Sequence, residues 1–172
     1  MNLTKAQVLA SRKRIASIAT RTSLKPSLAL SRDLGRTVSL KMETLQATGA
    51  FKLRGASNAI LSLPNDVKSR GVVTASSGNH GRALAYVARE LGIPADICLS
   101  NLVPSSKVEA IKSLGATVHV GGKDQDAAMA VAHDIDRGIQ RNRAVVYTPG
   151  FWRFIMLIIR NIPDRIFGRL EL

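Results

Sequence analysis

Residues 71–147 alternate short apolar segments with longer amphipathic ones, and this alternation constrains the fold more than any other feature of the sequence. Four segments have the length and composition of buried strands, at residues 72–75, 96–99, 116–120 and 144–147. Helices are predicted between them, at residues 82–91, 105–114 and 124–137. Strands that alternate with helices in this way form parallel sheets covered on both faces, with right-handed crossovers. We therefore predict an α/β fold with a doubly wound parallel four-stranded sheet.

The residues before this region predict a less regular segment. Residues 5–20 are predicted to form an amphipathic helix whose apolar positions include Val8, Ile15 and Ile18. Two further elements are predicted downstream, a short strand at residues 38–42 and a helix at residues 56–63. The first 32 residues contain no acid, which is also typical of a mitochondrial transit peptide. The helical pattern and the lack of a recognisable cleavage site favour a structural helix.

The charge and composition disfavour several classes of protein. Of the net charge of +13, residues 1–54 carry +9, from eleven Lys or Arg and two acids. A basic region suggests a nucleic-acid partner, but no aromatic residue precedes Phe51, so a stacking platform for single strands is missing. We expect no specific nucleic-acid binding. The single cysteine, Cys98, is consistent with a reducing cytoplasm, and three histidines give no metal-ligand spacing.

Lys52 is the first candidate for chemistry. It lies in Thr48-Gly-Ala-Phe-Lys-Leu-Arg-Gly55, between two apolar residues and next to a glycine-bounded turn. Partial desolvation there disfavours the ammonium and lowers its pKa, which a lysine that bonds to a carbonyl group requires. The alternative is a surface lysine whose stem packs on apolar neighbours.

The second candidate is the turn Ser76-Ser-Gly-Asn-His-Gly81, between a predicted strand and a predicted helix. Such a turn offers backbone N–H groups and the positive end of a helix dipole, which together bind anions. Neither a Walker motif nor a dinucleotide fingerprint is present, so a carboxylate is as suitable as a phosphate. The alternative is a helix cap without a ligand, and His80 is expected to be structural rather than catalytic.

Two stretches resemble a known family. Lys41-Met-Glu-Thr-Leu-Gln-Ala-Thr-Gly-Ala-Phe-Lys-Leu-Arg-Gly-Ala56 and Ser76-Ser-Gly-Asn-His-Gly-Arg-Ala-Leu-Ala85 are similar to the fold-type II pyridoxal-phosphate (PLP) enzymes. Within that family, the chain is most similar to threonine/serine dehydratases and serine racemase, and loosely to the hydroxyectoine-utilisation dehydratases. The resemblance runs from about residue 5 to residue 147, and two long motifs in the right order make it specific.

The resemblance implies a role for each candidate residue. Lys52 would bind PLP covalently and act as the base at the substrate α-carbon, and Phe51 would also contact the cofactor. Asn79 would donate to the ring hydroxyl of PLP. Backbone N–H groups of the substrate loop, made of Ser76, Ser77, Gly78, Asn79 and His80, would hold the substrate carboxylate. Ser77 matches the second acid/base of racemase relatives.

The implied reaction is that of an ammonia-lyase, which converts a threonine- or serine-type amino acid to a 2-keto acid and ammonia. Two alternatives stay open from the sequence: a serine-racemase-like isomerase, and a non-enzymatic module that binds an anion at the Ser76–Gly81 turn. The small amino acid would be the partner, and homo-oligomers are expected of the intact family. No metal site is predicted.

The last residues depart from the family pattern. We expect residues 1–45 to belong to a large PLP domain, residues 46–148 to form a small α/β domain, and residues 149–172 to be an apolar and basic tail foreign to the fold. A helix docked on the domain is the alternative for this tail, whose apolar run is too short to span a bilayer. In the family, a glycine-rich loop for the PLP phosphate follows instead. We therefore expect a truncated or frameshifted form with weak PLP binding and little turnover.

Overall fold

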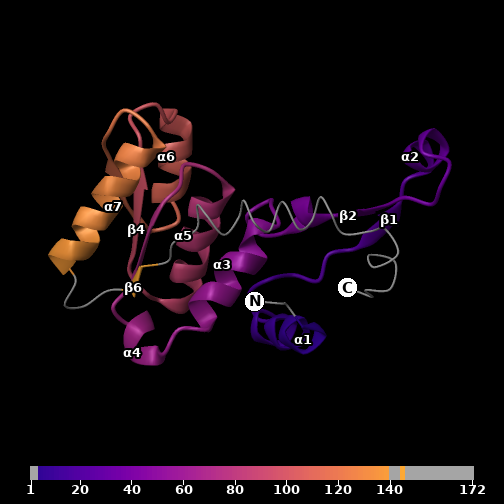
Figure 1. Cartoon of the computed structure of the whole chain (residues 1–172), viewed down its shortest axis with the longest axis horizontal. Coiled ribbons are helices and arrows are strands. Elements are labelled where there is room, and N and C mark those ends of the chain that lie inside the picture. Colours follow the sequence, from indigo (N-terminus) through magenta and orange to yellow (C-terminus); the bar gives the residue numbers. More distant parts are fainter. Residues whose placement is uncertain (1–3, 140–143, 146–172) are drawn as a thin grey trace.

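The structure is a computed structural model that describes residues 4–139 and 144–145 (Figure 1). Its helices are α1 Lys5–Arg14, α2 Leu28–Asp33, α3 Lys52–Leu61, α4 Asn65–Lys68, α5 Asn79–Leu91, α6 Ser105–Lys112 and α7 Gln125–Ile139, with a short 3-10 helix, η1, at Glu43–Leu45. Its strands are β1 Leu24–Pro26, β2 Ser39–Lys41, β3 Val72–Ala75, β4 Ala95–Leu99, β5 Thr117–Val120 and β6 Ala144–Val145.

Strands β3 to β6 form one parallel sheet in the order β5-β4-β3-β6. Val72 lies opposite Ala95 on one side of β3 and opposite Ala144 on the other, so β3 is a central strand. The predicted parallel four-stranded sheet is therefore confirmed. Residues 146–147 of the predicted fourth strand and the predicted tail at 149–172 lie outside the described residues.

The sheet is covered on both faces, as the doubly wound prediction requires. Successive side chains of a strand point to opposite faces. On one face, Val72, Ile97 and Leu99 join the core formed by α3, α5 and α6. On the other face, Val73 and Cys98 pack against α7 through Ala132 and its neighbours. Figure 1 shows α7 and α5 on opposite sides of β4.

Helix α3 joins the sheet domain through α5. Leu53 and Ile60 of α3 and Leu84 of α5 are fully buried in the same core. Helix α5 ends where predicted, because Gly92 takes the left-handed conformation with φ of 64° that commonly closes a helix.

The N-terminal region, residues 4–42, forms an arm that differs from the expectations. The predicted helix at 5–20 ends at Arg14, with Ile15 as its cap, and the following residues form turns. The strand at 38–42 exists as β2, but its antiparallel pairing with β1 and the small helix α2 between them were not predicted. In Figure 1 this pair of strands extends away from the sheet domain and carries α2 at its tip.

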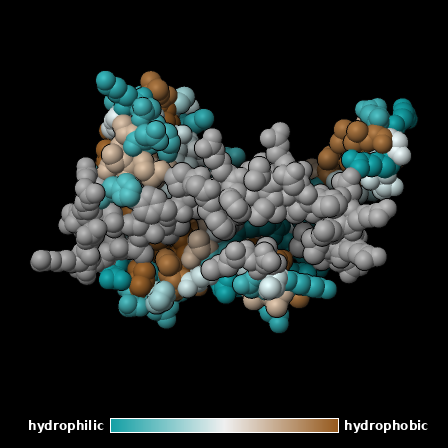
Figure 2. All heavy atoms as spheres, viewed as in Figure 1, coloured by the Kyte–Doolittle hydropathy of each residue, from teal (hydrophilic) through white to brown (hydrophobic). Residues whose placement is uncertain are grey.

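The arm has little core of its own. No residue of α1, β1, α2 or β2 is buried, and Leu28 of α2 is 81% exposed. Figure 2 shows hydrophobic surface at the α2 tip, where Leu28 and Leu34 are exposed. Among the described residues, no helix has the length and apolar character needed to cross a membrane.

Candidate active site

The substrate loop begins at the carboxyl end of β3, where open α/β sheets bind their ligands. Strand β3 ends at Ala75, and α5 begins at Asn79, three residues earlier than predicted. Asn79 and His80 therefore lie in the first turn of a helix and not in the turn that precedes it. Gly81 suggested a turn, but its role is packing: a Cβ at this position would overlap the carbonyl oxygen of Ser76.

The side chain of Ser76 completes the start of α5. Its Oγ accepts a hydrogen bond of 3.3 Å from the Gly81 N–H, and the Arg82 N–H donates to the Gly78 carbonyl, also at 3.3 Å. The first bond satisfies an N–H group for which a helix has no internal acceptor, and the second is the first i to i−4 bond of α5. The Ser76 hydroxyl is therefore used within the protein, and the prediction for Ser76 as a substrate contact concerns its backbone N–H.

Three consecutive backbone N–H groups precede Gly81 and Arg82 at the start of α5. Those of Ser77, Gly78 and Asn79 have no hydrogen-bond partner within the described part of the chain. They lie at the positive end of a helix of 13 residues. Apart from the chain neighbours of Gly78, no atom of the described residues lies within 4 Å of where its Cβ would be, so they leave the backbone accessible from that side. The arrangement has the donors, the dipole and the space that an anion such as a carboxylate needs.

Lys52 is the first residue of α3 and lies at the same site as His80. Its Nζ is 5.3 Å from the centroid of the Phe51 ring. Burial lowers the pKa of Lys52, the direction expected from its apolar neighbours in the sequence. Burial, together with the positive charge of Lys52, also lowers the pKa of His80 to about 4. His80 is buried and its imidazole is neutral at pH 7, so it adds no positive charge to the loop.

The structure brings two motifs far apart in the sequence to one place. Phe51 and Lys52 come from the start of α3, and the substrate loop comes from the start of α5, which packs on α3. The side chains of Phe51 and Asn79 are exposed, and that of Ser77 is half-buried. The roles assigned to these residues remain predictions.

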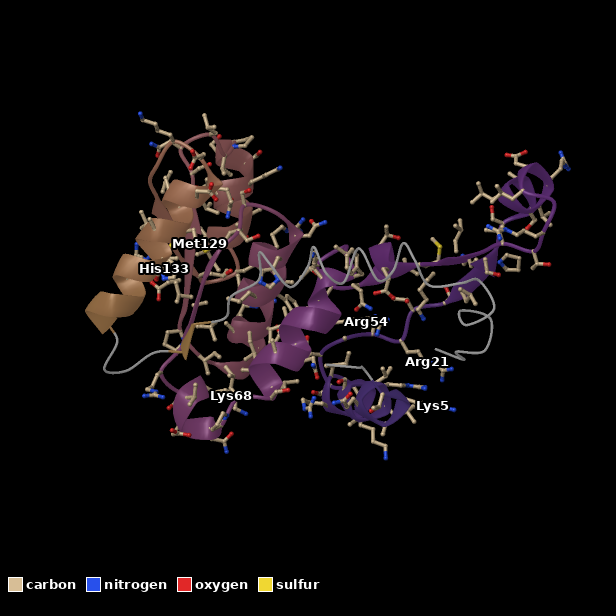
Figure 3. All side chains as sticks on the ribbon, viewed as in Figure 1. Lys5, Arg21, Arg54, Lys68, Met129 and His133 are labelled. Atoms are coloured by element: carbon tan, nitrogen blue, oxygen red, sulfur yellow. The ribbon has the colours of Figure 1, made fainter. Side chains whose placement is uncertain are left out.

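Sequence reasoning missed a polar cluster next to Lys52. Arg54 forms an ion pair with Glu43 through two hydrogen bonds, of 2.7 and 2.9 Å. Figure 3 labels Arg54 on α3, beside the N-terminal region. One signal was available in the sequence: Glu43 is the only acid between Asp33 and Asp66, in a strongly basic stretch.

A second missed contact joins α7 to the candidate site. The side-chain amide of Gln125, the first residue of α7, donates a hydrogen bond of 2.7 Å to the Ala75 carbonyl, at the end of β3. Gln125 therefore supports the strand end from which the substrate loop departs. Nothing in the local sequence indicates this long-range contact.

The described residues fit one end of PLP. A desolvated Lys52 suits a covalent bond with the aldehyde carbon, and Asn79, exposed at a helix start, can donate to the ring hydroxyl. The resemblance assigns the phosphate to a glycine-rich loop beyond the similar region, and no described residue is assigned to it. Among residues 4–139 and 144–145, no group of three or more His, Cys, Asp and Glu side chains could hold a metal ion.

Comparisons with known proteins identify the family of the chain. A protein from Sinorhizobium fredii, named "Putative threonine dehydratase", is 50% identical over 127 residues, which are 74% of this chain and 38% of the relative. The L-threonine ammonia-lyase of Thermotoga maritima is 39% identical over 130 residues, covering 76% of this chain and 32% of the relative. The crystal structure of serine racemase from Dictyostelium discoideum superposes with a TM-score of 0.77 at 32% identity, covering 84% of this chain and 46% of the other.

The chain thus spans less than half the length of these relatives. The family model described as "Pyridoxal-phosphate dependent enzyme" matches residues 15–158, which include Lys52 and the whole substrate loop. By this match, which extends over most of its length, the chain belongs to the family of pyridoxal-phosphate dependent enzymes.

Proposed function

We propose that this chain carries the lysine-bearing half of a PLP-dependent ammonia-lyase that converts a threonine- or serine-type amino acid to a 2-keto acid and ammonia. One observation supports it above all: the half-buried Lys52, whose pKa is lowered by burial, lies at the same site as the start of α5, where three N–H groups have no partner in the described residues. A module that only binds anions has no need of a desolvated lysine.

Each group has a distinct task in this proposal. Bound PLP supplies an electron sink for the substrate α-carbon. The lowered pKa of Lys52 increases the fraction of neutral amine, which is the form that attacks a carbonyl carbon and takes a proton from a carbon atom. The N–H groups of Ser77, Gly78 and Asn79 hold the substrate carboxylate and so orient the α-carbon toward Nζ.

The dehydratase is preferred to the racemase on the names of the relatives. The two sequence relatives described above, at 50% and 39% identity, are named as a dehydratase and an ammonia-lyase, whereas the racemase structure shares 32% identity. An isomerase is the second candidate, because the half-buried Ser77 lies in the substrate loop, where racemase relatives have a second acid/base. We further propose a cytoplasmic location and a small amino acid as the partner.

The proposal covers only the part of the relatives that this chain spans. The chain spans less than half the length of its relatives, and no described residue is assigned to the PLP phosphate. Much of the cofactor's binding energy is expected from that phosphate, so the roles proposed for the described residues are limited to the covalent bond, the ring hydroxyl and the substrate carboxylate.

The test is to add PLP to the purified chain, reduce with borohydride and locate the modified lysine by peptide mass spectrometry. We expect stable labelling of Lys52, which is lost in Lys52→Ala and kept in the control Lys112→Ala, a lysine on the exposed side of α6. Assays with serine and threonine follow, and formation of D-serine would favour the racemase. Labelling spread over the surface lysines, with Lys52 no more reactive than the rest, would contradict the proposal.

A further inference from the structure

Glu43 and Arg54 close a loop that contains Lys52. The two residues lie eleven positions apart in the sequence, and their two hydrogen bonds join η1 to the first turn of α3. The Glu43 side chain is 18% exposed and that of Arg54 is 33% exposed, so the pair is shielded from water more than the Arg89–Glu90 and Lys112–Glu109 pairs. Two parallel bonds of this kind fix orientation as well as distance.

The same pair is anchored to the N-terminal region. Thr22 donates its hydroxyl to Glu43 at 2.6 Å, and Arg54 donates to the Thr20 carbonyl at 3.1 Å. Gln46 completes the cluster, since its side-chain amide exchanges two hydrogen bonds with the Thr20 backbone, at 2.8 and 3.0 Å, and donates to Glu43 at 3.1 Å. We call Thr20, Thr22, Glu43, Gln46 and Arg54 the Glu43 cluster.

Leu53 is fully buried and anchors one side of the start of α3, but no side-chain cap closes this helix end. Its cap residue, Phe51, makes no side-chain capping bond, and the segment before it contains Gly49 in the left-handed region, with φ of 68°. A helix start without a side-chain cap frays more easily than a capped one. Lys52 lies at this start, and a lysine that must meet a fixed carbon atom requires a fixed backbone.

We propose that Glu43 and Arg54 are positioning residues that hold the first turn of α3, and with it Lys52, in the orientation that bonds PLP. The inference rests on the proposed function of Lys52. It assigns no contact with PLP or substrate to either residue, since both act through the backbone of α3.

The test measures PLP capture at Lys52 in Glu43→Gln, Arg54→Met and Arg54→Lys. We expect the rate of borohydride-trapped labelling to fall about tenfold in the first two variants, as small misplacements of a reacting group do. Arg54→Lys keeps the charge but only one of the two bonds, so its rate should fall less, by roughly threefold. Arg89→Lys and Glu109→Gln, from exposed ion pairs on α5 and α6, should capture PLP like the wild type.

Two further readouts separate positioning from loss of fold. Acetylation of Lys52 by acetic anhydride, which needs no orientation, should stay within about twofold of the wild type, whereas unfolding would raise it at each half-buried lysine, Lys41, Lys52 and Lys68. Exchange of the Leu53 and Arg54 amide protons should be about tenfold faster in Glu43→Gln, as expected for the loss of a charge-assisted hydrogen bond, and exchange in the middle of α5 should not change.

The outcomes distinguish this inference from the proposed function. A wild type that is not labelled at Lys52 refutes the proposed function, while amide exchange still decides whether the Glu43 cluster holds α3. Unchanged PLP capture in a folded Arg54→Lys and unchanged exchange in Glu43→Gln would overturn the positioning role. Arg54→Lys keeps the ion pair, so it decides the matter if Glu43→Gln does not fold.

Discussion

The sheet domain and the N-terminal arm are held together by different forces. From α3 to α7, the helices pack on two faces of a parallel sheet, and nearly all buried hydrophobic side chains belong to this region. In the arm, the turns after α1 bury Ile15 and Ala19, but its helices and strands bury nothing. The comparison shows that a short chain can place most of its burial in one region and attach another by polar contacts and a small apolar one, here Ile18 against the core of the sheet domain.

Those polar contacts are few and specific. The Glu43 cluster ties residues 20–22 and 43–46 to α3, and Arg14 donates a hydrogen bond of 2.6 Å to Asn58 on the same helix. Both links end on α3, the helix that begins with Lys52. A change in the arm can therefore reach the candidate site without disturbing the sheet.

The largest expected effect is in the core of the sheet domain. Leu84→Ala should lower the free energy of unfolding by about 2–5 kcal/mol, because the fully buried side chain leaves a cavity. The matched change Leu28→Ala in the arm should cost less than about 0.5 kcal/mol, because that side chain is exposed. Urea unfolding of both variants measures the difference, and equal losses would mean that the two regions share one core.

The next effect is a pH dependence confined to the sheet domain. The pKa of His80 is about 4 in the folded chain and 6.5 when unperturbed, so the unfolded chain binds more protons between these values. Stability is therefore fully present above pH 6.5 and falls as the pH drops to 4, by roughly 3 kcal/mol in total. Urea unfolding at pH 7, 5.5 and 4 should show this loss in the wild type and in His133→Asn, a control on the exposed side of α7. An equally steep loss in His80→Asn would assign it to other groups.

A smaller difference in stability is expected between alanine substitutions at two glycines, Gly81 and Gly78. Gly81→Ala should destabilise the sheet domain by about 1–3 kcal/mol, because its Cβ would overlap the Ser76 carbonyl. Gly78→Ala meets open space and should cost less than about 1 kcal/mol, yet place a methyl group beside the proposed carboxylate site. Thermal unfolding compares the two, and a Gly81→Ala variant as stable as Gly78→Ala would show that the start of α5 yields easily.

The smallest effect should stay within the arm. Thr4 caps α1 in a reciprocal pair with Gln7, and its removal in Thr4→Ala should weaken α1 by about 0.5–2 kcal/mol. Because α1 buries no residue, the main unfolding transition should not move. Amide exchange in α1 measures the local loss, and a shift of the main transition would show that α1 folds together with the sheet.

The positions of strands and helices that depend on the spacing of apolar residues could be predicted from the sequence. Strand β3 lies where the apolar run placed it, at Val72–Ala75, and α6 begins at Ser105 as predicted. Burial on both faces of a parallel sheet leaves continuous apolar runs, which are readable from one sequence. The expected direction of the Lys52 pKa was likewise readable, because its apolar neighbours are adjacent in the chain.

Contacts between distant residues were not predictable in the same way. Ile15 continues the apolar spacing of α1, but the chain turns there, so the predicted helix was too long. Gly81 suggested a turn, because the sequence does not show that the Ser76 carbonyl leaves no room for a Cβ at this position. The Glu43–Arg54 pair and the Gln125–Ala75 bond join residues that meet only after folding.

The packing of Cys98 on the α7 face of the sheet gives the chain its own reporter of motion. Cys98 is the single cysteine of the sequence, is fully buried on β4 and contacts the core beneath α7. Burial raises the pKa of its thiol to about 11, so almost no reactive thiolate exists while α7 stays in place. The rate of alkylation of this thiol therefore reports how often α7 separates from β4, and no cysteine has to be introduced to measure it.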